Sequence, residues 1–197
     1  MGQNEVTQTI TTADIQTTET LFFKDCTQCT YTLQASCTKL IIRKYCFTNE
    51  VKEDADKGRA ENCKQFKLVL PEEARILTHI LEAWSCTDLA IDAKIDVRTY
   101  QIDLSEGVKI TVDKRQHFQQ LIWASTENLL VQFTACKSVF KGGIKEMQVI
   151  NPTVRKDFDQ FILRFVKVRR WLCSGLGERP SYQQVLEQDD RTGRFTQ

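Results

Sequence analysis

The chain has little that would mark a membrane, secreted or proline-rich protein. Only three of its 197 residues are proline, so no proline-rich segment is present. No window approaches the roughly twenty consecutive apolar residues of a membrane-spanning helix, and the N-terminus M-G-Q-N-E-V-T lacks the apolar stretch of a secretory signal. Lysine plus arginine number 27 and aspartate plus glutamate 26, so the overall charge gives no reason to expect binding to nucleic acid or to an anionic membrane. These absences favour a cytoplasmic globular protein.

Groups that carry catalysis or hold cofactors are also scarce. The two histidines, His79 and His117, are isolated in the sequence. No Ser/His/Asp grouping, nucleotide-binding glycine loop or paired-carboxylate spacing stands out. We therefore expect a protein that is not an enzyme and that holds no cofactor.

Cysteine is the exception, with eight residues in the chain. Without a secretory signal, such cysteines are expected to stay reduced rather than to form disulfides. Cys26 and Cys29 make a C-x-x-C pair, but no second pair follows at zinc-finger spacing, so no metal site is expected. Cys26, Cys63 and Cys86 instead fit equivalent corner positions, where a small side chain that tolerates burial suits a tight turn.

What the sequence does contain is a repeated unit between Ala83 and Phe133. Ser85, Ser105 and Ser125 stand twenty residues apart (105 − 85 = 125 − 105 = 20), and each opens a polar corner between two alternating apolar runs. A period of about twenty is typical of coiled β-architectures, in which each repeat buries its apolar side only by stacking on its neighbours. The repeat predicts a mainly β protein built as a solenoid.

The pattern divides the chain into an N-terminal segment, the solenoid, a helical segment and a tail. Residues 1–20 are polar and form either a flexible arm or a strand that caps the first coil. Residues 21–150 form the solenoid, with a charged insertion, 44–61, looping out of one corner. Alternatively, Tyr45 to Val51 is a strand of its own. Residues 178–197 are a polar tail.

From residue 151 to residue 177 the apolar period becomes that of an amphipathic helix. Its apolar face consists of Phe158, Phe161, Ile162, Phe165, Val168 and Leu172. Such a helix packs on the solenoid, docks on a partner or lies on a membrane surface. Phe161 and Phe165 would anchor it in the first two cases, and Arg169 and Arg170 are further candidates for partner contacts.

Two tryptophans, Trp84 and Trp123, lie beside predicted corners, where they either project as partner contacts or pack inside. After Phe133 the pattern weakens, and Ile144 to Ile150 is expected as the last strand. One repeat also carries charges at alternating positions, which are either the solvated faces of strands or a flat recognition ladder: Asp92, Lys94, Asp96 and Arg98.

The repeat residues resemble those of a known family. The series S-C-T-D-L-A-I-D-A-K-I-D-V-R-T-Y-Q-I-D-L-S-E-G-V-K-I-T-V (85–112), followed by L-I-W-A-S-T-E-N-L-L-V (121–131), resembles the C-terminal β-helical domain of the cyclase-associated proteins. This CARP domain is related to tubulin-folding cofactor C. The resemblance covers residues 20–133 outside the insertion and implies a right-handed parallel β-helix of about six coils. It also implies binding to monomeric actin, often as a homodimer formed through C-terminal strands, although such strands are not evident in this sequence.

The cofactor C branch of the family implies one catalytic role. Those relatives carry an arginine on a β-helix face that completes the active site of a GTPase, as an arginine finger does. The corresponding stretch here is C-T-K-L-I-I-R-K-Y-C (37–46), in which the family's arginine aligns near Ile41. Arg43 follows two residues later, an offset that keeps a side chain on the same face of a strand. The other interpretation of Arg43 is a solvated edge residue.

The residues and the resemblance together predict a non-enzymatic interaction or scaffold protein of the cytoskeleton. Its partners would be actin, or the microtubule and axonemal proteins of a cilium, and not nucleic acid. The alternative is a GTPase-activating protein that uses Arg43.

Overall fold

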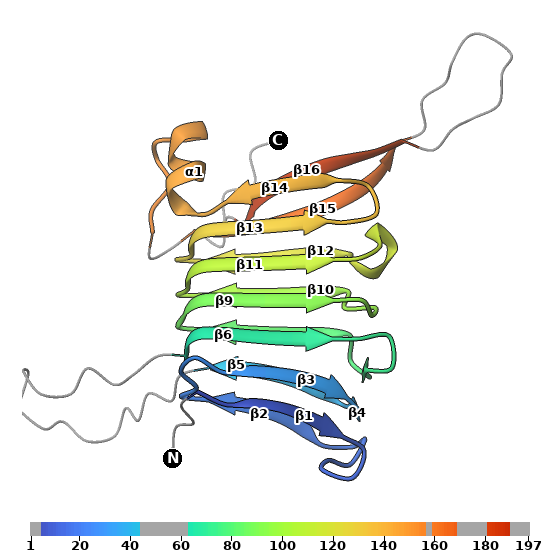
Figure 1. Cartoon of the computed structure of the whole chain (residues 1–197). Coiled ribbons are helices and arrows are strands. Elements are labelled where there is room, and N and C mark those ends of the chain that lie inside the picture. The colour runs from blue at the N-terminus through green and yellow to red at the C-terminus, as the bar shows by residue number, and fades with distance from the viewer. Residues whose placement is uncertain (1–4, 44–62, 157–158, 169–180, 190–197) are drawn as a thin grey trace, which may run out of the picture.

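The chain folds into a parallel β-solenoid, as the repeat predicts. The structure is a computed structural model that describes residues 5–43, 63–156, 159–168 and 181–189; for residues 43, 165–168 and 181–189 it describes the backbone alone. The coils stack in one column, with the first strands at one end and the C-terminal elements at the other (Figure 1). The fold class expected from the repeat is therefore confirmed.

Two seven-stranded sheets form the walls of the column, and a short two-stranded sheet pairs β4 with β7. Sheet A contains, in spatial order, β1 (Thr7–Thr11), β3 (Thr30–Gln34), β6 (Cys63–Leu70), β9 (Cys86–Ala93), β11 (Glu106–Val112), β13 (Glu127–Phe133) and β14 (Ser138–Gly142). Sheet B contains β2 (Thr20–Lys24), β5 (Lys39–Arg43), β8 (Ile80–Trp84), β10 (Thr99–Asp103), β12 (Gln120–Ala124), β15 (Gln160–Val168) and β16 (Ser181–Asp189). The remaining elements are β4 (Ser36–Cys37), β7 (Arg75–Ile76), the short 3-10 helix η1 (Arg115–His117) and α1 (Ile144–Ile150).

Each turn of the column places one strand in sheet A and the next long strand in sheet B. All pairings from β1 to β13 in sheet A and from β2 to β12 in sheet B are parallel. The chain thus completes five turns, and β13 begins a sixth. After β13 the direction reverses, because β14 pairs with β13 in antiparallel fashion. The N-terminal segment contributes β1 at the edge of sheet A, which agrees with its interpretation as a capping strand.

Alternation along each strand builds the core. On β9, for example, Leu89, Ile91 and Ala93 are buried while the residues between them are exposed or half-buried. Register then aligns buried residues of successive coils, so that Ile91 lies between Leu68 and Ile110. Every coil therefore buries its apolar side against the coils above and below, which is why the repeat is stable only as a stack.

The described corners that lead from sheet B to sheet A contain two left-handed backbone positions, three residues apart; Asp88, Gly107 and Asn128 occupy the second of them. Ser85, Leu104 and Ser125 occupy the first position with φ of 53°, 54° and 48°. The three serines of the sequence repeat thus meet at one corner, but Ser105 is offset by one residue and points inward beside Cys86, whose N–H it accepts at 3.1 Å. The coil length is accordingly 19 and then 21 residues (104 − 85 = 19; 125 − 104 = 21).

Small side chains fill the inward position after each of these corners, as the cysteine pattern predicts. The register aligns β6 with β9 at Cys63 and Cys86 and continues through neighbouring coils. All members of this corner column are 3% exposed or less: Cys26, Cys63, Cys86, Ser105 and Thr126. Larger side chains would not fit between the stacked turns, because the interior is filled by the residues of the adjacent coils.

Residues 160–168 are a strand, so the prediction of an amphipathic helix from 151 to 177 is wrong over this stretch. β15 pairs with β12 in antiparallel fashion, and β16 pairs with β15. Phe161 and Leu163 point into the core, whereas Arg164 is exposed. The sequence Phe-Ile-Leu-Arg fits a period of two as well as a helical period, and the unpaired edge of sheet B decides between them.

Residues 144–150 are a helix, α1, and not the last strand that the sequence suggested. The last strand of sheet A is β14, which lies just before it. Gly143 connects the two with φ of 135°, and a Cβ there would lie 3.0 Å from the backbone nitrogen of Asn128. Ile144 and Met147 of α1 are buried, so the helix covers the end of the core. No helix among the described residues has the length and apolar character needed to cross a membrane.

Candidate functional site

The outer face of sheet A carries a row of lysines that follows the axis of the solenoid. Lys67 on β6 and Lys109 on β11 lie on either side of Ala90 in the strand register. Lys109 and Lys141 on β14 lie in the same way on either side of Leu130. We call Lys67, Lys109 and Lys141 the lysine row. All three side chains are exposed.

The sheet fixes the spacing of the lysine row. Neighbouring strands lie about 4.8 Å apart, so successive lysines, two strands apart, lie about 10 Å apart. Among the described residues, none of the three makes an ion pair. Acidic side chains flank the row on both sides of Ala90 on β9: Asp88, which lies against Gly107, and Asp92, in the adjacent outward row between Val69 and Thr111. The row therefore presents three lysines that make no ion pair with any described residue on a flat, regular surface, with acidic side chains in the adjacent rows.

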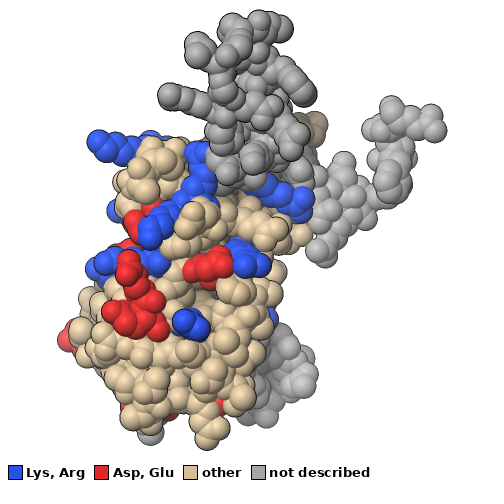
Figure 2. Space-filling model, turned by 90° about the vertical axis from the view of Figure 1, so that its right-hand side faces the viewer, with Lys and Arg blue, Asp and Glu red and all other residues tan. Residues whose placement is uncertain are grey.

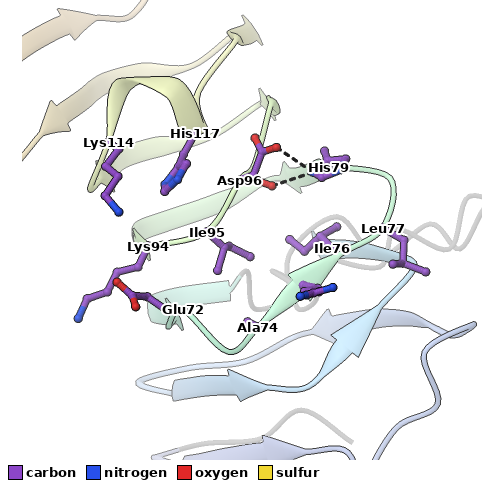
Figure 3. Close-up of a pocket in the computed structure, with 11 residues that line it drawn as sticks. Glu72, Ala74, Ile76, Leu77, His79, Lys94, Ile95, Asp96, Lys114 and His117 are labelled. Carbon is purple, nitrogen blue, oxygen red and sulfur yellow. Dashed lines mark hydrogen bonds and ion pairs between the residues drawn. The ribbon is translucent and has the colours of Figure 1, made fainter.

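A second surface feature is a hollow on the side of the column where the connections from sheet A to sheet B lie. Figure 2 shows this side, with acidic and basic side chains next to one another over its middle and upper part and few charges over the N-terminal coils below. The hollow has a volume of about 500 Å³. Its walls come from three consecutive connections: residues 72–79, residues 94–96 and residues 114–117 (Figure 3).

Both histidines of the chain line this hollow. His79 Nδ1 lies 3.0 Å from the carbonyl oxygen of Asp96 and 3.5 Å from its Oδ2. Arg98 Nε donates to the same Oδ2 at 3.1 Å. His117 comes from η1, and its ring points toward the hollow from the opposite wall (Figure 3). Asp96 Oδ1 and His117 Nδ1 are buried atoms without a hydrogen-bond partner in the described structure.

The remaining lining of the hollow combines an apolar floor with basic side chains. Ile76 and Ile95 are buried and form the floor. Arg75, Lys94 and Lys114 are exposed at its border. Within the described residues, no group of three or more His, Cys, Asp or Glu side chains is placed to hold a metal ion.

The sequence did not reveal that His79 and His117 share one surface, although a signal was present. The two histidines are 38 residues apart (117 − 79 = 38), close to twice the coil length, which places them on nearby turns of a solenoid. Asp96 and Lys94 also occupy this region, because they lie in the connection after β9 ends at Ala93. The alternating charges expected on a strand face are thus partly on a loop.

Two of the aromatic residues that the sequence suggested for partner contacts lie inside the molecule. Trp123 is 0% exposed and Phe161 is 2% exposed. Their rings stack with 5.4 Å between centroids, so the packing alternative holds for both. Trp84 is half-buried, and its Nε1 donates to Asp103 Oδ2 at 3.0 Å.

The other predicted residues are placed only in part. The backbone of Phe165 lies in β15, opposite Gln184 of β16. Arg43 ends β5 and pairs with Lys24 on one side and Trp84 on the other. Arg169 and Arg170, the insertion 44–61 and most of the tail lie outside the described residues.

Hydrogen bonds among the buried thiols shift their pKa values in opposite directions. The backbone N–H of Cys26 donates to Cys63 Sγ at 3.3 Å. Thiol hydrogen bonds from Cys26 and Cys86 hold the pKa of Cys63 well below the usual thiol value. The same contacts, with burial, raise the pKa of Cys26 and Cys86 above their usual range. Because all three are buried, this chemistry belongs to the interior of the column.

An acidic residue of the column, Glu127, forms ion pairs with α1 and with the segment that follows it. Glu127 of β13 binds Lys145 at 2.8 Å and Lys156 at 2.9 Å. These two lysines lower the pKa of Glu127 to about 2. In the same region Ser125 Oγ donates to the carbonyl oxygen of Lys156 at 2.6 Å. The contacts tie α1 and the segment after it to the fifth and sixth coils.

The chain matches no model of a known protein family and no curated protein. The parallel β-solenoid alone does not decide a function. The functional argument therefore depends on the two surface features, the lysine row and the hollow.

Proposed function

We propose that this protein is a non-enzymatic interaction or scaffold module of the cytoskeleton, acting in the cytoplasm, and that it binds an acidic surface of its partner through the lysine row. The observation that carries the proposal is the alignment of Lys67, Lys109 and Lys141 on one outward row of a rigid sheet. The CARP resemblance supplies the class of partner: actin, or a microtubule or axonemal assembly.

The lysine row supports recognition because its charge is concentrated and its spacing is fixed. The chain as a whole has a net charge of +1, yet this row carries three positive side chains that pair with no residue in the part of the chain that the structure describes. Ala90 and Leu130, the residues between the lysines, are small or apolar, so a flat partner can approach the backbone closely. Each exposed ion pair contributes only about 0.2–1 kcal/mol. The row therefore steers and orients a partner more than it supplies the whole affinity.

A cosedimentation experiment tests the proposal. The purified chain is mixed with actin filaments or with microtubules and centrifuged, and binding to monomeric actin is measured by gel filtration. The variant Lys67→Glu/Lys109→Glu/Lys141→Glu is expected to lose at least about tenfold in affinity, because each site changes from attraction to repulsion. The matched control Arg75→Glu/Lys94→Glu/Lys114→Glu changes the net charge equally on another face and should bind as the unmodified chain does.

The alternative function, activation of a GTPase by Arg43, has one supporting observation. Leu40 and Ile42 of β5 are fully buried, and Arg43 occupies the next strand position, at the end of the strand beside Trp84. A measurement of GTP hydrolysis by tubulin or small GTPases, with and without the chain, tests this function. Stimulation that Arg43→Ala abolishes supports it, and no stimulation by the unmodified chain rejects it.

A further inference from the structure

We propose that the hollow lined by His79 and His117 binds a phosphate monoester whose organic part is a compact ring. This site lies on a different face from the lysine row and does not depend on the proposed partner. Its volume, about 500 Å³, lies within the roughly 300–1,000 Å³ of typical small-molecule sites.

The basic side chains of the border favour an anion. Lys94 and Lys114 come from successive coils and extend on the same side of the hollow (Figure 3). Lys94 and Arg75 make no ion pair within the described part of the chain, and Lys114 has only a 3.9 Å contact with Asp113. Donors from three separate connections suit a phosphate, because it offers three oxygens where a carboxylate offers two.

The contacts of Asp96, the acidic residue inside the hollow, offset part of its negative charge. The Oδ2 atom of Asp96 already accepts a hydrogen bond from Arg98 and lies next to His79. This oxygen is thereby engaged on the His79 side, away from Lys114 (Figure 3), whereas Oδ1 has no hydrogen-bond partner among the described residues. The other acidic residue that lines the hollow is Glu72, whose side chain is exposed to solvent at the border.

The floor explains why the ligand should carry a ring. Ile76 and Ile95 are buried at the bottom of the hollow, and the exposed side chain of Leu77 borders it. Small-molecule sites combine such apolar surface with a few polar groups that fix orientation. The anion would then lie between Lys94, Lys114 and His117, and the ring on the isoleucines.

The chain offers a site-specific probe of this proposal, because its only two histidines line the hollow. The imidazole signals of the full chain are followed by proton–carbon NMR during titration with phenyl phosphate. We expect both signals to shift and saturate. Inorganic phosphate should bind at least about tenfold more weakly, because it leaves the apolar floor empty. Phenylacetate should also bind more weakly, because it offers one oxygen fewer.

A double substitution and two natural phosphate monoesters complete the test. Lys94→Gln/Lys114→Gln should weaken phenyl phosphate at least about tenfold, whereas Lys67→Gln/Lys109→Gln should leave it unchanged. Tighter binding of O-phosphotyrosine than of adenosine monophosphate assigns the site to a phosphorylated protein, and the reverse order assigns it to a nucleotide. Absence of shifts with phenyl phosphate, equal binding of inorganic phosphate or phenylacetate, or full binding by Lys94→Gln/Lys114→Gln would overturn the proposal.

Discussion

Trp123 and Phe161 stack across the junction at which the parallel part of sheet B ends. Their ring centroids are 5.4 Å apart, with 27° between the ring planes. They are also opposite each other in the register, because Trp123 of β12 pairs with Phe161 of the antiparallel strand β15. The contact joins β15 to the last complete coil and closes the core at that end.

Loss of this contact should destabilise the whole column. Phe161→Ala removes a buried ring, and we expect the free energy of unfolding to fall by about 3–5 kcal/mol. Denaturant unfolding followed by fluorescence or circular dichroism measures the change. Ile162→Ala, on the half-buried outward side of the same strand, should cost distinctly less. Equal losses in the two variants would show that β15 does not bury Phe161 as described.

At the second left-handed corner position, Gly107 stands where the neighbouring coils have Asp88 and Asn128, and its surroundings predict a cost for a larger residue. Its φ is 68°, and a Cβ there would lie 2.7 Å from Asp88 Oδ1 of the preceding coil. Gly107→Ala should therefore lower the free energy of unfolding by about 1 kcal/mol or more. In an Asp88→Ala background the same change should cost less, because only the backbone strain remains. A thermal or denaturant double-mutant cycle gives the answer, and an unchanged stability in Gly107→Ala would contradict the corner geometry.

The contact of Glu127 with Lys145 and Lys156 predicts a pH dependence of stability. The pKa of Glu127 is about 2 in the folded chain and about 4.3 when unfolded. A carboxyl group whose pKa is lowered by folding stabilises the fold at pH values above its unfolded pKa. This contribution is lost as the pH falls from about 4.3 toward 2. Glu127→Gln should thus be less stable than the unmodified chain at pH 7, with the difference shrinking below pH 4. A difference that persists at pH 2 would contradict the ion-pair account.

Exposure predicts which described cysteine reacts with solvent. Cys136 is exposed, whereas Cys26, Cys29, Cys37, Cys63 and Cys86 are buried. In a chain with Cys46→Ser and Cys173→Ser, a thiol reagent should label one sulfur quickly and the other five only after unfolding. Desolvation raises the pKa of Cys136, but hydrogen bonds with Ser138 and the charge of Arg115 outweigh it and lower the pKa overall.

The lowered pKa of Cys136 predicts the pH profile of its labelling. The thiolate is the reactive form, so the rate should rise with pH, and the midpoint of this rise should lie below the usual thiol pKa. Ser138→Ala removes one of the lowering contacts and should move the midpoint to higher pH. Rapid labelling of several buried sulfurs in the folded chain would show that the coils are open.

The repeat predicted the solenoid because stacking requires each coil to carry the same inward pattern. The residue that occupies the left-handed position of each corner was harder to predict. Ser105 is twenty residues from both Ser85 and Ser125, but it lies one residue after Leu104, which occupies the equivalent position, because the coil length varies between 19 and 21 residues. Side chains alone do not show where such a one-residue difference is absorbed.

The C-terminal strands and the hollow could not be predicted for a different reason. The stretch around Phe161 fits both a helical and an alternating period, and only the open edge of sheet B selects the strand. The hollow forms from three connections whose backbone paths have no repeating pattern. His79 and Asp96 meet there because of the turn conformation, and not because of strand alternation.

The lysine row provides the most direct test of the functional account. The measurement is cosedimentation or gel filtration of the chain with actin and with microtubules, comparing the unmodified chain with Lys67→Glu/Lys109→Glu/Lys141→Glu. The account predicts binding to at least one of these partners, weakened at least about tenfold by the triple substitution and unaffected by Arg75→Glu/Lys94→Glu/Lys114→Glu. Absence of binding to all of them, or equal binding by the triple variant, would contradict it.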